Sequence, residues 1–170
     1  MKRFRVLLLL CLLVLGGCTG EQTLELYILP AERVNEQTMT DAEIGKVALQ
    51  EGRLALRGED FSGVDWEQQM FAVKSEASVS VSVVTSEHGG SSLLKTTGDD
   101  LFVWMLDGKA VYVGGFERGT SSVTSQRSPY IKDRERYIFS VLSIGEGDIR
   151  FNKKLYSYFH SHDLIKSQLD

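Results

Sequence analysis

The stretch Leu-Phe-Val-Trp-Met-Leu-Asp-Gly-Lys-Ala-Val-Tyr-Val-Gly-Gly-Phe, residues 101–116, carries the strongest structural signal in this chain of 170 residues. Its two apolar runs flank Asp107-Gly108, a dipeptide that accepts the positive φ angles of a tight turn between antiparallel strands. Gly114-Gly115 then favours a bulge or a close approach by another backbone segment. The stretch therefore predicts a β-hairpin, from which the rest of the fold can be worked out.

Apolar residues at strand and helix spacing extend this pattern in both directions along the chain. A helix is expected over residues 41–50, because Thr40 and Glu43 have the spacing of a capping box. Further strands are expected over residues 24–29, 53–57, 70–74 and 137–144. Residues 137–144 are almost continuously apolar, which is typical of a central strand covered on both faces.

The C-terminal region predicts one further helix, over about residues 150–160. Its apolar side chains recur at intervals of three and four residues and would pack on a sheet. This stripe consists of Phe151, Leu155, Tyr158 and Phe159. The sequence thus predicts an α+β fold: a small, mostly antiparallel sheet with the central hairpin 101–116 and a packed C-terminal helix.

The first seventeen residues have the plan of an export signal. Met1–Arg5 is basic, Val6–Leu15 is a run of ten apolar residues, and small residues follow. Ten residues rise about 15 Å as a helix, roughly half the thickness of the hydrocarbon layer. The run is therefore too short for a stable membrane span, and we expect it to be removed as a signal peptide.

The signal closes with Leu15-Gly16-Gly17-Cys18, which resembles the lipobox of bacterial lipoproteins at all four positions. This resemblance implies cleavage before Cys18 and a diacylglyceryl thioether on its sulfur. Acyl chains of the palmitate type would then hold the protein at the extracytoplasmic face of the cell membrane. The alternative is an incidental thiol after a plain signal peptide, since Cys11 shows that cysteines do occur in this region.

The expected organisation is a signal peptide over residues 1–17, a lipidated N-terminus and tether over 18–23, and one α+β domain over 24–170. The five tether residues after Cys18 reach at most about 18 Å, so the domain would lie close to the bilayer. The signal holds three of the 19 basic residues and none of the 23 acidic ones, so the net charge of −4 becomes −7 after cleavage. This balance argues against a nucleic-acid partner and predicts repulsion from anionic lipid.

Motifs in the domain point to a group of related proteins. Residues 65–69 read Asp-Trp-Glu-Gln-Gln, residues 102–116 fit Phe-Val-x-x-x-Asp-Gly-x-x-x-Tyr-x-Gly-x-Phe, and Asp148-x-Arg150-x-Asn152 precedes the C-terminal helix. These segments resemble a group of exported or lipid-anchored proteins of Gram-positive bacteria. The resemblance implies a shared fold and supplies no activity. Residues 75–85 alternate Val and Ser like a strand, whereas the corresponding stretch in that group looks helical, so both readings stay open.

The candidate ligand-facing residues lie in or after these motifs. They are Trp66, Tyr112, Ser121, Ser122 and Arg150. Aromatic side chains can line a sugar-binding or peptide-binding face, but in strands they more often belong to the core. The Ser121-Ser122 pair matches the group, although the surrounding loop departs from it.

Patterns with catalytic or metal-binding chemistry are sparse. His160-Ser161-His162-Asp163 has the composition of a metal site, but residues two apart on a helix point in nearly opposite directions. The sequence contains no Gly-x-Ser-x-Gly elbow and no glycine-rich phosphate loop. We therefore expect no catalytic residue, no metal and no cofactor.

Two classes of function remain at this stage. The favoured class is a non-enzymatic envelope lipoprotein whose domain binds an envelope protein or a small ligand near the membrane. The alternative is an envelope hydrolase or metal-dependent enzyme that uses Asp65, Glu67, Arg150 or the pair His160 and His162.

Overall fold

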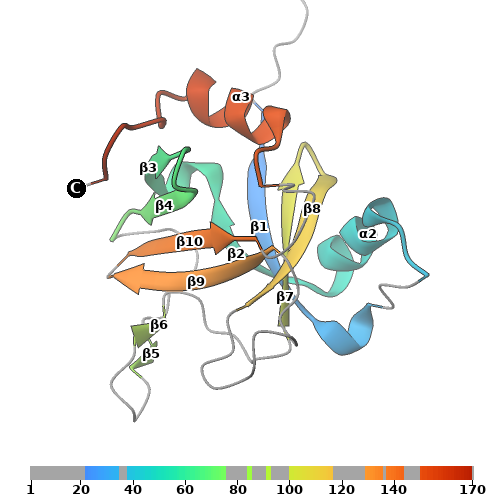
Figure 1. Cartoon of the computed structure of the whole chain (residues 1–170). Coiled ribbons are helices and arrows are strands. Elements are labelled where there is room, and N and C mark those ends of the chain that lie inside the picture. Colours follow the sequence, from blue (N-terminus) through green and yellow to red (C-terminus); the bar gives the residue numbers. More distant parts are fainter. Residues whose placement is uncertain are drawn as a thin grey trace, which may run out of the picture.

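The computed structural model describes residues 22–34, 38–75, 84–85, 91–92, 100–116, 129–135, 137–143 and 150–169 (Figure 1). Ten strands are found in these ranges: β1 (Leu24–Pro30), β2 (Arg53–Arg57), β3 (Phe61–Asp65), β4 (Met70–Val73), β5 (Val84–Thr85), β6 (Ser91–Ser92), β7 (Asp100–Leu106), β8 (Lys109–Phe116), β9 (Tyr130–Glu135) and β10 (Ile138–Leu142). The helical elements there are η1 (Ala31–Arg33), α2 (Asp41–Glu51), η2 (Gly58–Asp60) and α3 (Lys153–Ser161).

Eight of these strands form one sheet in the order β2-β1-β7-β8-β9-β10-β4-β3, and β5 and β6 form a separate pair. The sheet is mixed, because β8 and β9 run parallel while the other neighbours run antiparallel. Its two edge strands, β2 and β3, follow one another in the chain through the three residues of η2. The edge strands are therefore joined at one end, and the sheet curls into a nearly closed, barrel-like form (Figure 1).

This architecture corrects the predicted α+β fold. The protein is mostly β-structure, with a mixed eight-stranded sheet in place of a small, mostly antiparallel one. Residues 101–116 do form the β7–β8 hairpin, and both Asp107 (φ 52°) and Gly108 (φ 70°) adopt the positive φ angles of its turn. The prediction was wrong because it missed β3 in a glycine-containing stretch and β9 in a charged one, and these two strands extend the sheet towards closure.

Strand β7 is covered on both faces because its side chains alternate between two cores. Phe102, Trp104 and Leu106 point into the barrel, where they join the large apolar core. The intervening side chains, Leu101, Val103 and Met105, form a second core on the outer face, together with apolar residues of α2. The hairpin stretch thus organises the domain from both sides.

Helix α3 lies across one end of the barrel (Figure 1). Its Phe159 is fully buried, and its ring centroid lies 5.5 Å from that of Phe61 and 6.1 Å from that of Trp104. The helix begins later than predicted, because the Asn152 side chain caps it by accepting hydrogen bonds from the Lys154 and Leu155 amides. Phe151 is consequently outside the helix and 45 % exposed instead of packed on the sheet.

The segment after α3 covers the free edge of β3. Ile165 forms a parallel bridge to Val64. The Val64 amide donates to the Leu164 carbonyl at 2.8 Å, and the Lys166 amide donates to the Val64 carbonyl at 2.9 Å. An otherwise unpaired strand edge is thereby protected.

Several sequence predictions concern residues outside the described ranges. These are the signal peptide over residues 1–17, Cys18, most of the undecided stretch 75–85, and the Ser121-Ser122 pair. Of the stretch 75–85, residues 84–85 belong to strand β5.

Candidate functional site

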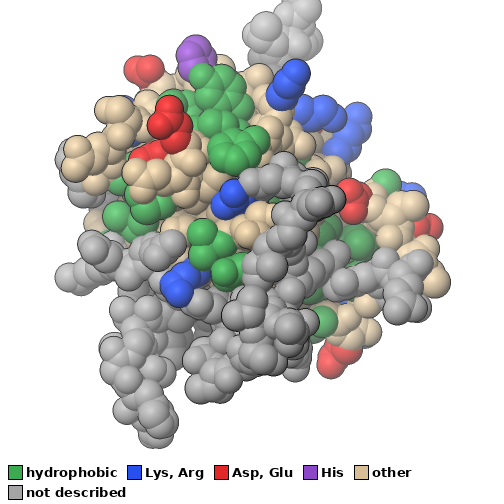
Figure 2. Space-filling model, in the orientation of Figure 1, with side chains coloured by type: hydrophobic (Ala, Val, Ile, Leu, Met, Phe, Trp, Pro, Cys, Tyr) green, Lys and Arg blue, Asp and Glu red, His purple; other side chains and the backbone are tan. Residues whose placement is uncertain are grey.

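An exposed aromatic cluster joins the β3–β4 turn to α3. We call Trp66, Phe151 and Tyr156 the Trp66 cluster. The ring centroid of Trp66 lies 6.1 Å from that of Phe151 and 5.4 Å from that of Tyr156, both in edge-to-face geometry. Phe151 is 45 % exposed and Tyr156 is 40 % exposed, which is unusual for side chains of this size in a small domain. Figure 2 shows hydrophobic side chains gathered on this face of the molecule.

Polar groups border the Trp66 cluster. The Arg150 guanidinium carbon lies 5.5 Å from the Phe151 ring centroid, and its Nη1 donates a hydrogen bond to the Val141 carbonyl at 3.1 Å. The His160 ring lies 5.7 Å from that of Tyr156. A cationic group and an imidazole ring therefore border an apolar surface.

The predicted ligand-facing residues have different positions in the structure. Trp66 and Arg150 both contact Phe151, so the fold brings these two together. Tyr112 is only 2 % exposed and packs inside the barrel, 5.9 Å from Phe102 between ring centroids. Sequence reasoning did not name Phe151 or Tyr156 as surface residues. The sequence did contain one indication that Tyr156 is exposed, because this residue lies off the apolar stripe of its helix.

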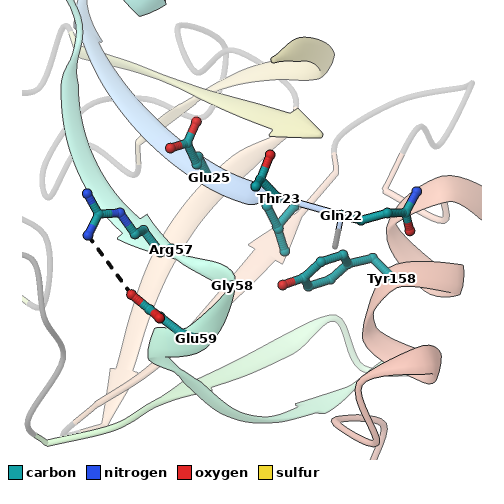
Figure 3. A pocket seen from close by; sticks show the side chains of 8 residues that line it. Gln22, Thr23, Glu25, Arg57, Gly58, Glu59 and Tyr158 are labelled. Carbon is teal, nitrogen blue, oxygen red and sulfur yellow. Dashed lines mark ion pairs between the residues drawn. The ribbon is translucent and has the colours of Figure 1, made fainter. Parts of the chain in front are cut away.

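A pocket of about 270 Å³ lies where the described chain enters β1. We call it the Tyr158 pocket (Figure 3). Gln22, Thr23 and Glu25 line one side, and the β2–η2 segment with Tyr158 of α3 lines the other. Gly58 is required there, because a Cβ at this position would collide with the Tyr158 hydroxyl.

The charged groups in the Tyr158 pocket are two carboxylates and one guanidinium. Arg57 Nη1 and Glu59 Oε1 lie 3.9 Å apart, and both side chains are well exposed, so solvent weakens this ion pair. Glu25 accepts a hydrogen bond from the Tyr27 hydroxyl at 3.3 Å. Burial raises the pKa of Tyr27, and the adjacent Glu25 carboxylate raises it further. With Glu25 and Glu59 against Arg57, the lining carries a formal charge of −1, so the pocket does not favour an anionic ligand.

A second pocket, of about 420 Å³, adjoins the first through the shared residue Gln22. We call it the lysine pocket, because Lys109, Lys153 and Lys154 line it together with Asp107. Asp107 is engaged with the incoming chain: its Oδ1 accepts from the Thr23 amide at 3.0 Å and its Oδ2 accepts from Gln22 Nε2 at 3.4 Å. The rim is basic although the chain as a whole is acidic.

Several of the residues named for an enzymatic alternative are held by different structural contacts. The Asp65 carboxylate accepts the Gln68 amide at 3.0 Å within the β3–β4 turn, and the His162 ring stacks on Tyr158 at 4.1 Å. His162 Nδ1 lies 2.8 Å from the Tyr158 carbonyl, whereas His160 faces Tyr156. Across the described ranges, no three His, Cys, Asp or Glu side chains come together in a way that could hold a metal ion.

In comparisons with known proteins, no family model, no curated protein and no solved structure matches this chain. Among the described residues, no helix has the length and apolar character needed to span a bilayer.

Proposed function

We propose that this protein is a lipid-anchored lipoprotein of the cell envelope whose barrel domain binds a partner without catalysing a reaction. The lipobox-like sequence Leu15-Gly16-Gly17-Cys18 supports the anchor, and the short tether that follows it would keep the domain near the membrane. The partner is an envelope protein or a small ligand. The resemblance to exported Gram-positive proteins agrees with this assignment.

The Trp66 cluster is the observation that carries the binding role. The Trp66 ring contacts the rings of both Phe151 and Tyr156, yet these two side chains stay substantially exposed. Rigid aromatic side chains with an arginine beside them are the residue types that dominate binding hot spots. Burial of these rings by a partner would recover apolar area that folding leaves in water.

Site-specific crosslinking in the native envelope tests the binding role. A photoreactive side chain in place of Phe151 should give a discrete adduct, and Trp66→Ala in the same chain should abolish it, because the platform beside the probe is lost. Leu49 supplies the matched control, since it is 47 % exposed but lies on α2, away from the cluster. Equal adducts from both positions, or none from Phe151, would contradict the proposal.

The anchor is tested independently of the binding role. Cys18→Ala should block lipid attachment and cleavage, so the chain should keep its signal peptide and lose the acyl mass seen by mass spectrometry. Cys11→Ala is the control, because this residue would be discarded with the signal. Normal maturation of the Cys18→Ala chain would rule out the lipoprotein assignment.

A further inference from the structure

The basic rim of the lysine pocket has no explanation within the fold. Lys109 follows the β7–β8 turn, and Lys153 and Lys154 open α3. All three side chains are exposed, and within the described ranges none of them forms an ion pair. Figure 2 shows Lys and Arg side chains gathered near α3.

Helix energetics make the two α3 lysines costly for the folded domain. The N-terminus of a helix carries partial positive charge, so acidic side chains are favoured in its first turn. The first turn of α3 contains no acidic residue and places Lys153 and Lys154 there instead. Helix stability therefore disfavours these lysines, and an external anionic partner would offset that cost.

The position of the rim identifies this partner. Gln22 lines the lysine pocket and lies four residues after Cys18. Even a fully extended chain of this length places the Cys18 anchor at most about 14 Å from Gln22. The one acid of the pocket, Asp107, holds Gln22 and Thr23 through the hydrogen bonds described above. The chain thus leaves the domain towards its attachment point from within the basic rim.

We propose that Lys109, Lys153 and Lys154 rest on anionic phospholipid head groups and set the orientation of the anchored domain. The inference rests on the proposed lipid anchor and reverses the expectation of uniform repulsion from the net charge. Three lysines face the bilayer, while the net negative charge lies elsewhere on the molecule. An anionic bilayer surface attracts each nearby lysine strongly enough to raise the ratio of contacting to non-contacting states about fivefold.

Lysine footprinting on the lipidated, mature protein tests this orientation. The protein is reconstituted in vesicles of phosphatidylcholine alone or mixed with phosphatidylglycerol, and the acetylation rate of each lysine is measured by mass spectrometry. Acetylation of Lys109, Lys153 and Lys154 should slow by about fivefold on the anionic vesicles. Lys46, an exposed residue of α2, is the internal control and should react equally on both.

Salt and charge variants separate head-group contact from other causes of protection. Raising the salt from about 0.1 M to about 1 M shortens the screening length from about 10 Å to about 3 Å and should remove the protection. The double variant Lys153→Gln, Lys154→Gln should restore the acetylation of Lys109, whereas Lys46→Gln should not. Inorganic phosphate added to neutral vesicles should leave the rates unchanged, because the partner is a bilayer surface.

Equal acetylation of the three lysines on both vesicle types would overturn the orientation even if the anchor is present. If the purified protein carries no lipid, the proposed anchor fails, and the same chain is then added to both vesicle types from solution. Sedimentation with the anionic vesicles alone, lost in the double variant, would still support the basic surface. No sedimentation with either type would refute it.

Discussion

At the scale of single residues, the contact between Gly58 and Tyr158 fixes how α3 sits on the barrel. Gly58 is buried in η2, at the point where the chain passes from one edge of the sheet to the other. The Tyr158 hydroxyl occupies the space that a side chain at position 58 would need. This contact also forms a wall of the Tyr158 pocket.

Gly58→Ala should therefore lower the free energy of unfolding by about 1–3 kcal/mol, the usual cost of overpacking a buried site. Chemical denaturation would measure the loss. Tyr158→Phe in the same chain should recover part of it, because the closest atom is removed while the ring carbon Cζ would still lie 2.7 Å from the new Cβ. Strictly additive effects of the two substitutions would contradict the contact.

At the scale of elements, α2 carries a pH-dependent cap. The Thr40 side chain accepts from the Glu43 amide, and the Glu43 carboxylate accepts from the Thr40 amide at 2.8 Å. The Thr40 hydroxyl also donates to this carboxylate at 2.8 Å. The hydrogen bonds that the carboxylate accepts from the Thr40 amide and hydroxyl lower the pKa of Glu43 below its usual value of 4.5. A lowered folded-state pKa adds stability above the unfolded-state value, and this stability is lost as the pH falls through the folded-state pKa.

Glu43→Gln should accordingly destabilise the protein at neutral pH and have a progressively smaller effect as the pH falls below about 4.5. Thermal melts across this pH range would measure the difference from the unchanged chain. Gln50→Ala near the other end of α2 is the control, because neither side chain titrates, and its effect should stay constant across the same window. A constant difference for Glu43→Gln would exclude the cap as its cause.

The elements that sequence reasoning found are those with a local cause. The Asp107-Gly108 turn, the capping box of α2 and the apolar alternation of β1 can each be recognised within ten residues. Strand β9 reads Tyr-Ile-Lys-Asp-Arg-Glu and carries no such signal because it is mostly charged, although it pairs with the neighbouring β10. Its parallel pairing with β8, which joins the two halves of the sheet, depends on a segment that is not its neighbour in the chain, so closure of the sheet could not be predicted locally.

The candidate surfaces were found only in part. Trp66 and Arg150 were named from motifs, but their meeting at Phe151 depends on where α3 begins. The Asn152 cap sets that position. The basic rim escaped notice because the net charge averages over the whole chain. Three lysines from two distant segments become neighbours only when α3 packs beside the hairpin turn.

At the scale of the whole molecule, Trp104 links the barrel to α3. Its side chain is fully buried, and its ring lies within 6.1 Å, between centroids, of Phe61, Phe71 and Phe159. These partners come from β3, β4 and α3. The parts of the domain that contact Trp104 should thus unfold together.

Trp104→Ala should cost about 3–5 kcal/mol of stability, since a large cavity would open where three elements meet. The loss should appear as one cooperative transition when circular dichroism and hydrogen exchange in α3 are compared. Trp66→Ala is the control and should cost far less, because the residue is only partly buried. Early exchange of α3 alone in the unchanged protein would refute the coupling.

The bridge between Val64 and Ile165 also determines when the domain can finish folding during export. It joins positions about one hundred residues apart, so no earlier part of the sequence can substitute for it. If the chain is exported N-terminus first, as proposed, β3 crosses the membrane long before its edge partner arrives. The domain can then complete its fold only after Ile165 has also crossed, so the edge of β3 stays unpaired until that point of translocation.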